Sequence, residues 1–264
     1  MTNNLTGASL SNKKNRQRSL EPDVSSYKEF IDTLYDDLEF VITRLTQSRD
    51  KYAAGMRTNP KEGEDLINTN IANMLTCRGW TATHDTHING HADIVVKVSY
   101  EDYLWIGESK INQGSSYIHK GFKQLLYRYS TGLDHQSAGG ILIYMNRTKK
   151  TQLQIMEDWK KILCGEDIPP EQDIEPLTKE QCNVLEDDQY INLPITKIES
   201  CPKNSLCFHT THTHPQSGLD YIVRHMGIDF RYDPQDQNLS ARNTDDEATD
   251  SSKEAENEPQ STSD

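Results

Sequence analysis

The chain has 264 residues, a formal net charge of −13 and 34% apolar residues. This acidic balance argues against a general, non-specific nucleic-acid binder, which needs a basic surface. Five cysteines without framework spacing, no signal peptide and no apolar segment of membrane-spanning length predict a soluble cytoplasmic protein.

The first part of the chain predicts a basic tail followed by an amphipathic helix. Residues 1–24 are polar and rich in Ser, Asn and Lys, which is typical of disorder. Within 25–57, a helix is predicted from about residue 26 to residue 51, because its apolar residues recur at steps of three and four. This stripe either packs on the rest of the chain, the more common outcome, or binds a protein partner or a second copy of the chain. It consists of Tyr27, Phe30, Leu34, Leu38, Val41, Ile42 and Leu45.

A second helix and a first strand are predicted next. Pro60 interrupts the chain, and a new apolar stripe indicates a helix from about 61 to 78, with Gly79 as its stop. Residues 80–87 alternate weakly between polar and apolar, which predicts a strand, and residues 88–90 predict a turn.

A β-hairpin is predicted from two apolar, β-branched runs, 90–98 and 103–110, separated by a polar turn. Asp93 lies at the start of the first strand. Glu108 and Lys110 end the second strand on one face, because they are two residues apart. The hairpin therefore brings three charged groups to one end of a sheet. An Asp and a Glu there form a hard-oxygen site suited to Mg²⁺ or Mn²⁺, and a Lys beside them can orient water or stabilise charge on a phosphate.

Three further elements follow the hairpin. Residues 115–129 predict a helix, 139–146 a strand buried on both faces, and 152–163 another helix. The order over 61–163 is therefore α-β-β-β-α-β-α, which predicts an α/β fold with a mixed sheet. The helix over 115–129 carries four polar or basic residues of interest, Lys120, Lys123, Gln124 and Arg128.

The set of Asp93, Glu108 and Lys110, with this order of elements, resembles the PD-(D/E)xK nuclease superfamily. Ala92 replaces the Pro that often precedes the first acid. The resemblance covers residues 58–163 and implies a restriction-endonuclease-like core, with a mixed four-stranded sheet between helices, a helical N-terminal extension and a C-terminal β element.

The resemblance also implies a function, a magnesium-dependent endonuclease that hydrolyses phosphodiester bonds in DNA. Asp93 and Glu108 would hold Mg²⁺ or Mn²⁺, and Lys110 would position water or stabilise charge. A helix acid, Glu64 first and Glu62 second, would reach the site. Gln124 would contact the site, and the implied contacts to the DNA backbone are Lys120, Lys123 and Arg128. Because no DNA-reading module is visible, we expect a partner protein to direct the enzyme to DNA, by analogy with bacterial defence against foreign DNA.

Other interpretations stay open. The chain could be a catalytically silent binding or regulatory subunit with a nuclease fold, or a nuclease that cleaves RNA. The spacing of Glu108 and Lys110 also fits a solvated surface pair, and Glu64 also fits a surface acid near a helix start.

The last part of the chain predicts three segments. Residues 164–200 are acidic and contain prolines, which is typical of a connector, with a short helix near 178–186. Residues 201–234 predict a β element that extends the sheet edge or covers the core, with strands over 206–213, 221–223 and 228–232. Residues 235–264 predict a disordered acidic tail.

Cysteines and histidines gather in this β element, but their C-x5-C-x-H-x2-H-x-H spacing matches no common structural zinc pattern. In a strand, His209 and His212 point to opposite faces. The sequence His209-Thr210-Thr211 also fits the H-x-T element of two-histidine phosphoesterases, for which His84-Asp85-Thr86 is a poor second copy. We expect no stoichiometric Zn²⁺ at the set Cys201, Cys207, His209, His212 and His214.

Overall fold

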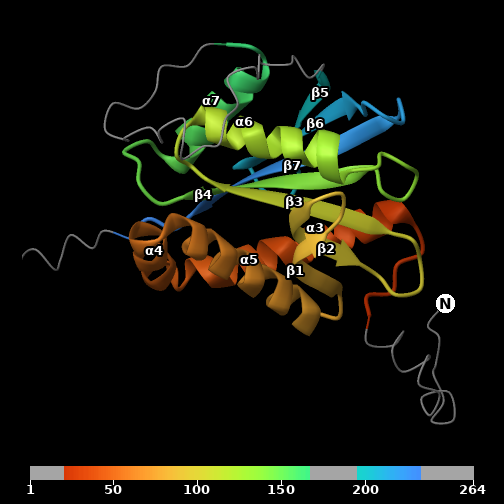
Figure 1. The fold of residues 1–264 in the computed structure, drawn as a ribbon, viewed down its shortest axis with the longest axis horizontal. Coiled ribbons are helices and arrows are strands. Elements are labelled where there is room, and N and C mark those ends of the chain that lie inside the picture. The colour runs from red at the N-terminus through yellow and green to blue at the C-terminus, as the bar shows by residue number, and fades with distance from the viewer. Residues whose placement is uncertain (1–20, 167–194, 233–264) are drawn as a thin grey trace, which may run out of the picture. The chain divides into compact units, whose positions relative to one another are not determined.

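A seven-stranded mixed β-sheet is the central layer of the structure, a computed structural model that describes residues 21–166 and 195–232 (Figure 1). All described helices and strands lie within the unit that ends at Arg231. In chain order they are α3 (Tyr27–Thr46), α4 (Arg49–Thr58), α5 (Pro60–Cys77), β1 (Thr81–His87), β2 (His91–Lys97), β3 (Leu104–Ile111), α6 (Ser115–Lys123), the π-helix η1 (Gln124–Tyr129), β4 (Ala138–Met145), α7 (Gln152–Leu163), β5 (Ile195–Ser200), β6 (Cys207–Thr213) and β7 (Asp220–Asp229).

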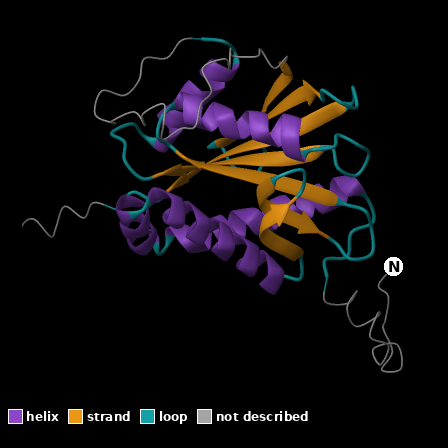
Figure 2. Cartoon of the chain, in the orientation of Figure 1, coloured by secondary structure: helices purple, strands orange, loops and turns teal. Residues whose placement is uncertain are grey.

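The strands are ordered β1-β2-β3-β4-β7-β6-β5. The central strands β3, β4 and β7 are parallel, and antiparallel pairs complete the sheet on both sides. Figure 2 shows helices on both faces of the sheet. The predicted α/β class with a mixed sheet is confirmed. The prediction of four strands is wrong, because the C-terminal β element joins the same sheet through β7, directly beside β4.

Two apolar clusters fill the space between the sheet and the helices. Helices α3, α4 and α5 cover one face, where their side chains pack with those of the inner strands around Trp105. Helices α6, η1 and α7 cover the other face around Phe122 and Trp159 (Figure 1). Continuous apolar runs such as β4 are explained by this arrangement, because both of their faces are buried.

The predicted N-terminal helix is shorter than expected. It begins after Ser26, whose hydroxyl accepts a hydrogen bond from the Glu29 amide, and α3 ends at Thr46 before α4 starts. Its apolar stripe is buried in the core, with Phe30 and Leu34 fully inaccessible. The stripe therefore packs within the chain, so it does not offer a surface for docking a partner protein or a second copy.

The helix and hairpin that lead into the predicted site form where the sequence predicts them. Helix α5 is followed by Gly79 with a φ of 95°, the left-handed conformation that favours glycine after a helix. The turn between β1 and β2 contains Asn89 and Gly90, both with positive φ. Strands β2 and β3 pair antiparallel, with Ile94 opposite Gly107, so the acid-bearing end of β2 lies beside the end of β3.

The helix predicted over 115–129 changes type along its length. It is α-helical to Lys123 and continues as the π-helix η1, whose wider turn is seen in the hydrogen bond from the Ser130 amide to the Leu125 carbonyl. Such π segments are frequent at functional sites, because the extra residue in the turn redirects side chains.

The C-terminal strands differ most from prediction. The sequence places strand β5 in the acidic connector, because its Lys197 and Glu199 are charged. In the structure these two residues form an ion pair on an exposed edge strand. Strand β7 is continuous rather than split. Its polar residues Arg224 and His225 are buried, the first paired with Glu39 and the second bonded to the Trp159 indole.

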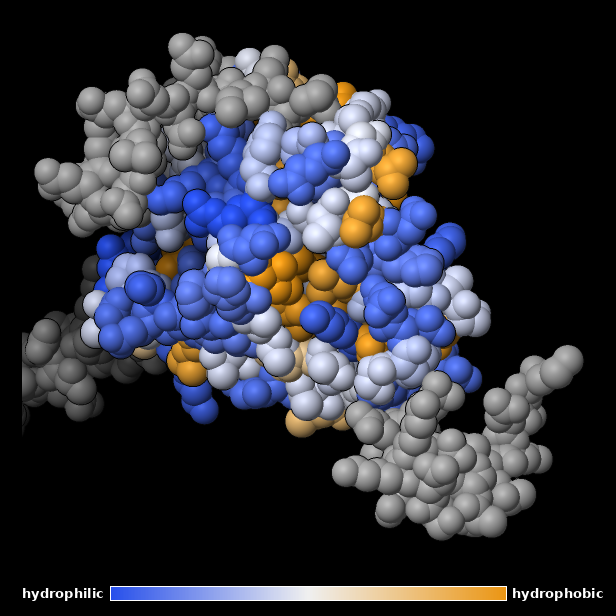
Figure 3. Space-filling view, turned by 45° about the vertical axis from the view of Figure 1, so that its right-hand side comes forward, coloured by the Kyte–Doolittle hydropathy of each residue, from blue (hydrophilic) through white to orange (hydrophobic). Residues whose placement is uncertain are grey.

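Several predicted segments lie outside the described residues, namely the basic tail up to residue 20, most of the acidic connector with its short helix, and the acidic tail from residue 233. None of the helices that the structure describes has the length and apolar character needed to cross a membrane. Figure 3 shows a mostly hydrophilic face with one recessed apolar area near its centre.

Alanine substitutions at two glycines should change the free energy of unfolding in opposite directions, and they therefore test the described packing. In β4, a Cβ at Gly140 would lie 2.5 Å from the Trp105 ring and 2.9 Å from Met226 Cε, so Gly140→Ala should lower the free energy of unfolding by about 1–3 kcal/mol. In α4, nothing lies within 4 Å of a Cβ at Gly55, so Gly55→Ala should raise it by about 0.5–1 kcal/mol. Urea denaturation of both variants measures the difference, and equal effects would contradict the described packing of Trp105.

Candidate functional site

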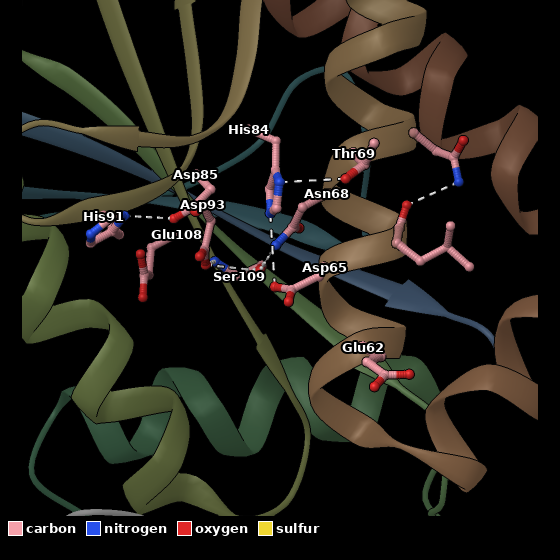
Figure 4. A network of polar contacts seen from close by, with 12 residues as sticks. Glu62, Asp65, Asn68, Thr69, His84, Asp85, His91, Asp93, Glu108 and Ser109 are labelled. Carbon is pink, nitrogen blue, oxygen red and sulfur yellow. Dashed lines mark hydrogen bonds and ion pairs between the residues drawn. The ribbon is translucent and has the colours of Figure 1, made fainter.

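The hairpin brings the three predicted charged residues together at one end of the sheet. Lys110 Nζ donates to Glu108 Oε1 at 2.6 Å and to the Ser109 carbonyl at 2.8 Å. The same Nζ lies 3.9 Å from Asp93 Oδ2. Figure 4 shows Asp93 and Glu108 beside one another. Since Asp93 comes from β2 and the other two from β3, the antiparallel pairing of these strands creates the cluster.

Helix α6 covers the cluster, in which Glu108 and Lys110 are buried and Asp93 is half-buried. Glu108 is 1% exposed and Lys110 is 7% exposed, so the pair is not the solvated surface pair that its spacing alone allows. A Cβ on Gly121 would lie 2.8 Å from Lys110 Cγ and 3.3 Å from Glu108 Cγ, so only glycine lets the helix approach this closely. The Tyr117 ring covers the cluster from the same helix, 5.6 Å from Lys110 Nζ.

Helix α5 contributes a third carboxyl group, the buried Glu64. Glu64 Oε2 accepts a hydrogen bond from the Ile111 amide at 2.9 Å, which ties α5 to the end of β3. Burial raises the pKa of Glu64 to about 7, with Lys110 opposing this rise and Asp93 adding to it. Glu62 is exposed and points away from the cluster in Figure 4. The structure therefore brings Glu64 to the site and not Glu62.

The cluster has more negative groups than positive ones. Burial raises the pKa of Glu108 to about 8, despite the opposing Lys110 ammonium. Burial lowers the pKa of Lys110, but the carboxylates of Glu108, Asp93 and Glu64 together raise it above its ordinary value. Lys110 is therefore protonated near neutral pH, and one ammonium faces three carboxyl groups. A proton or a metal cation relieves the remaining repulsion.

Three buried polar residues that the sequence interpretation missed hold Asp93 in place. Ser109 donates to Asp93 Oδ2 through its amide at 2.8 Å and through its hydroxyl at 2.9 Å. Asn68 of α5 bonds to the Ser109 hydroxyl, and Tyr144 of β4 bonds to Asn68. The available signals were a Ser inside the Glu-x-Lys motif and an Asn beside the apolar stripe of a helix. Neither identifies its partner.

Gln124 lies on the helix side that faces the cluster. It follows Gly121 by three residues, which places both on one face of the helix. Its Oε1 atom is buried and has no hydrogen-bond partner in the described part of the chain. An orphan acceptor of this kind is expected where a ligand or water binds.

The predicted DNA-contacting residues are less closely grouped. Arg128 is exposed and lies against the β1–β2 turn, where its Cδ is 3.0 Å from the position of a Cβ on Gly90. Its neighbour Tyr129 is buried, and burial together with Glu108 and Asp93 raises the pKa of this phenol. Arg128 is therefore next to the cluster in the fold. Lys120 and Lys123 are half-buried on α6.

The oxygen atoms of the site fit a hard divalent cation. Glu108 Oε2 is buried without a hydrogen-bond partner among the described residues, and once Glu108 is ionised this oxygen can only accept. Across residues 21–166 and 195–232, no three His, Cys, Asp or Glu side chains form a ready-made metal cage. Mg²⁺ does not need one, because it usually binds through one or two carboxylates and keeps several waters. Asp93 and Glu108 form such a pair.

The histidine-rich segment is spread over both faces of the sheet. Cys201, Cys207 and His209 belong to the α3 side, where the His209 ring lies 5.8 Å from that of Tyr35. His212 lies on the α6 side and bonds to Thr210 Oγ1 at 2.7 Å. These positions confirm that His209 and His212 point to opposite faces, so the two cannot ligate one ion.

His214 has a structural role at the end of β6. Its Nε2 is 2.9 Å from Ser130 Oγ, and its Nδ1 accepts from the amides of Gln216 and Ser217. The two-histidine phosphoesterase interpretation is wrong on geometry. His84 lies on β1 and His209 on β6, and four strands separate them in the sheet.

Comparison of the chain with protein-family models, with curated proteins and with solved structures gave no match in any of the three. The case for a function therefore depends on the residues and geometry of the site.

The buried Glu108 predicts a pH-dependent stability. Above about pH 4.5 the unfolded chain loses this proton, whereas the folded protein keeps it until the pH passes about 8. The unfolded state then binds fewer protons, so the stability of the parent protein falls as pH rises through this window. Relative to the parent, Glu108→Gln should gain on the order of 3 kcal/mol in the free energy of unfolding between pH 5 and pH 9, as measured by urea denaturation.

Glu29→Gln is the matched control. The Ser25 hydroxyl and amide donate to this exposed acid and lower its pKa from the ordinary value, which is the opposite direction to Glu108. The stability difference between Glu29→Gln and the parent should therefore stay constant from pH 5 to pH 9. A constant difference for Glu108→Gln as well would mean that Glu108 is solvated and ionised at neutral pH.

Proposed function

We propose that the protein is a metal-dependent nuclease that hydrolyses phosphodiester bonds in DNA. The observation that carries this proposal is the cluster of buried Glu108 and Lys110 with half-buried Asp93, in which one oxygen of the Glu108 carboxyl group has no hydrogen-bond partner among the described residues. A buried excess of like charge lowers stability, and such clusters occur preferentially where they serve chemistry. The resemblance to the PD-(D/E)xK superfamily and the identity of these three side chains support the same reaction.

Asp93 and Glu108 would hold Mg²⁺ or Mn²⁺ between β2 and β3. When bound, the cation polarises the phosphate and lowers the pKa of a water molecule. Glu64 adds negative charge behind the pair, and Gln124 offers a neutral oxygen that can accept from water. Because α6 covers the cluster, bulk water is largely excluded, and each charge interaction is stronger than it would be in solution.

Lys110 acts in this proposal as a fixed positive charge. Its raised pKa keeps it protonated, so it donates hydrogen bonds and does not accept a proton. A protonated lysine beside the reacting phosphate stabilises the negative charge that develops there. The proton released by the attacking water then passes to solvent or to an ionised carboxylate. Among these carboxylates, Glu64 has the pKa closest to neutral pH, at about 7, which suits a group that accepts a proton there.

Substrate binding has to overcome the acidic balance of the chain. Arg128 lies beside the cluster, and the proposal assigns Arg128, Lys120 and Lys123 to the DNA backbone. A net charge of −13 limits the number of phosphates that the protein alone can neutralise. A partner protein that delivers the nuclease to DNA, as in defence against foreign DNA, is part of the proposal. It would dock elsewhere than on the buried stripe of α3.

Cleavage assays test the activity directly. With Mg²⁺ the parent protein should cut plasmid and linear DNA, and EDTA should stop the reaction. Isosteric changes that remove one charge, Glu108→Gln and Lys110→Met, should each lower the rate at least about 100-fold, because they remove transition-state stabilisation. Gel assays under single-turnover conditions measure the rates, and circular dichroism shows whether each variant is folded.

The exposed pair Lys197 and Glu199 gives a matched control, because it has the same two-residue spacing on edge strand β5. Lys197→Met and Glu199→Gln should leave the rate unchanged. A folded Glu108→Gln or Lys110→Met variant that cuts at the parent rate would contradict the assignment. Cleavage of RNA alone would replace DNA as the substrate, and no cleavage of any substrate favours the silent subunit.

The charge of the chain predicts weak binding to DNA by the protein alone. At physiological salt we expect a dissociation constant above about 1 µM for a short duplex, weakening further as salt rises, because few phosphates can be neutralised. Fluorescence anisotropy with increasing salt measures this. Tight binding under these conditions would remove the need for a delivering partner and would point to a basic groove around Arg128.

A further inference from the structure

Asp93 is the end of a chain of hydrogen bonds that crosses four elements of the fold. Tyr144 Oη of β4 donates to Asn68 Oδ1 of α5 at 2.6 Å. Asn68 Nδ2 donates to Ser109 Oγ of β3 at 2.8 Å, and this hydroxyl donates to Asp93 Oδ2 of β2 at 2.9 Å. The hydroxyl, the amide and the phenol are all fully buried, so water does not compete for these bonds.

The carboxylate sets the direction of every bond in the chain. Asp93 Oδ2 accepts from the Ser109 amide and from the Ser109 hydroxyl, so this hydroxyl uses its single proton for the bond to Asp93. That hydroxyl can then only accept from Asn68, which must present its amino group to Ser109 and its carbonyl oxygen to Tyr144. Burial, with added effects of Glu64 and Asp93, raises the pKa of Tyr144 well above its ordinary value, so this phenol stays protonated as the first donor.

The chain leaves the two oxygens of Asp93 in different situations. Oδ2 accepts from both the amide and the hydroxyl of Ser109, and it also faces Lys110 Nζ. Oδ1 takes part in none of these three contacts. Two donors on one oxygen fix the plane of the carboxyl group, and a fixed carboxyl group presents its other oxygen in a constant direction. Outer hydrogen bonds of this kind tune metal ligands in proteins.

We propose that Ser109, Asn68 and Tyr144 are positioning residues, which orient Asp93 so that its Oδ1 is held ready for a divalent cation. This inference rests on the proposed function, because it assigns a role within the same metal centre. Tyr144 and Asn68 lie far from Asp93 in sequence, and neither touches the carboxylate itself. They act through Ser109, and their contribution is to geometry rather than to the chemical step.

Calorimetric titration with Mn²⁺ tests this assignment without measuring cleavage. Ser109→Ala keeps the backbone donor but removes the hydroxyl, and Asn68→Asp turns the serine proton away from Asp93 toward a new carboxylate. Both should weaken Mn²⁺ binding by about 10- to 100-fold relative to the parent. Asp93→Asn should abolish it.

A double-mutant cycle separates positioning from general stability. Tyr144→Phe alone should weaken Mn²⁺ binding, but in the Ser109→Ala background it should have little further effect, because the chain is already broken there. Ser130→Ala is the matched control: Ser130 is also buried, and its hydroxyl bonds to His214 Nε2 at 2.9 Å. This variant should lose thermal stability and keep the Mn²⁺ affinity of the parent.

The outcomes distinguish this inference from the proposed function. If the parent binds Mn²⁺ and the folded Ser109→Ala and Asn68→Asp variants bind it equally well, the positioning role is overturned, whereas the proposed metal site is supported. If the parent does not bind Mn²⁺, or if Asp93→Asn binds it as tightly, the metal centre fails and the positioning role fails with it. Additive losses from Tyr144→Phe and Ser109→Ala would overturn the role of Tyr144 as part of one chain.

Discussion

The buried contact between Lys110 and Glu108 is the constraint on which the rest of the site depends. A buried ammonium group beside a carboxyl group is tolerated only when its geometry and its hydrogen bonds compensate for the hydration that it loses. Here the ammonium also bonds to the Ser109 carbonyl and faces Asp93. Helix α6 can cover the pair only because residue 121 is glycine. The burial of this contact therefore depends on the glycine above it, on the pairing of β2 with β3 and on the position of α6.

The topology explains why the site forms at this end of the sheet. Strands β3, β4 and β7 are parallel, so their carboxyl ends meet along one edge, and crevices at such ends are the usual ligand sites of α/β folds. Strand β3 ends there with Glu108 and Lys110, and the following loop leads into α6, which returns across the cluster. Tyr144, near the end of neighbouring β4, donates a hydrogen bond to Asn68, which in turn contacts the site.

Prediction from sequence succeeded where structure depends on nearby residues. The β2–β3 hairpin, β4 and α7 follow from local alternation, continuous apolar runs and helical periodicity. Prediction failed where contacts between residues far apart in sequence determine the structure. Strand β7 is interrupted in sequence by Arg224 and His225, which look incompatible with a buried strand until Glu39 and Trp159 supply their partners. Strand β5 is charged because it is an exposed edge, so its sequence matches a connector equally well.

The same difference separates the residues of the candidate site that the sequence predicts from those that it does not. The three charged residues of its motif, Asp93, Glu108 and Lys110, lie within seventeen positions of one another in one hairpin, so a spacing pattern reveals them. The residues that hold Asp93 are buried, polar and uncharged, and Asn68 and Tyr144 are 76 positions apart. A buried Asn or Ser in sequence indicates only that some partner exists, because such groups must be hydrogen-bonded. The motif therefore indicates which charged groups come together, whereas the packing of α5 and β4 determines how accurately they are held.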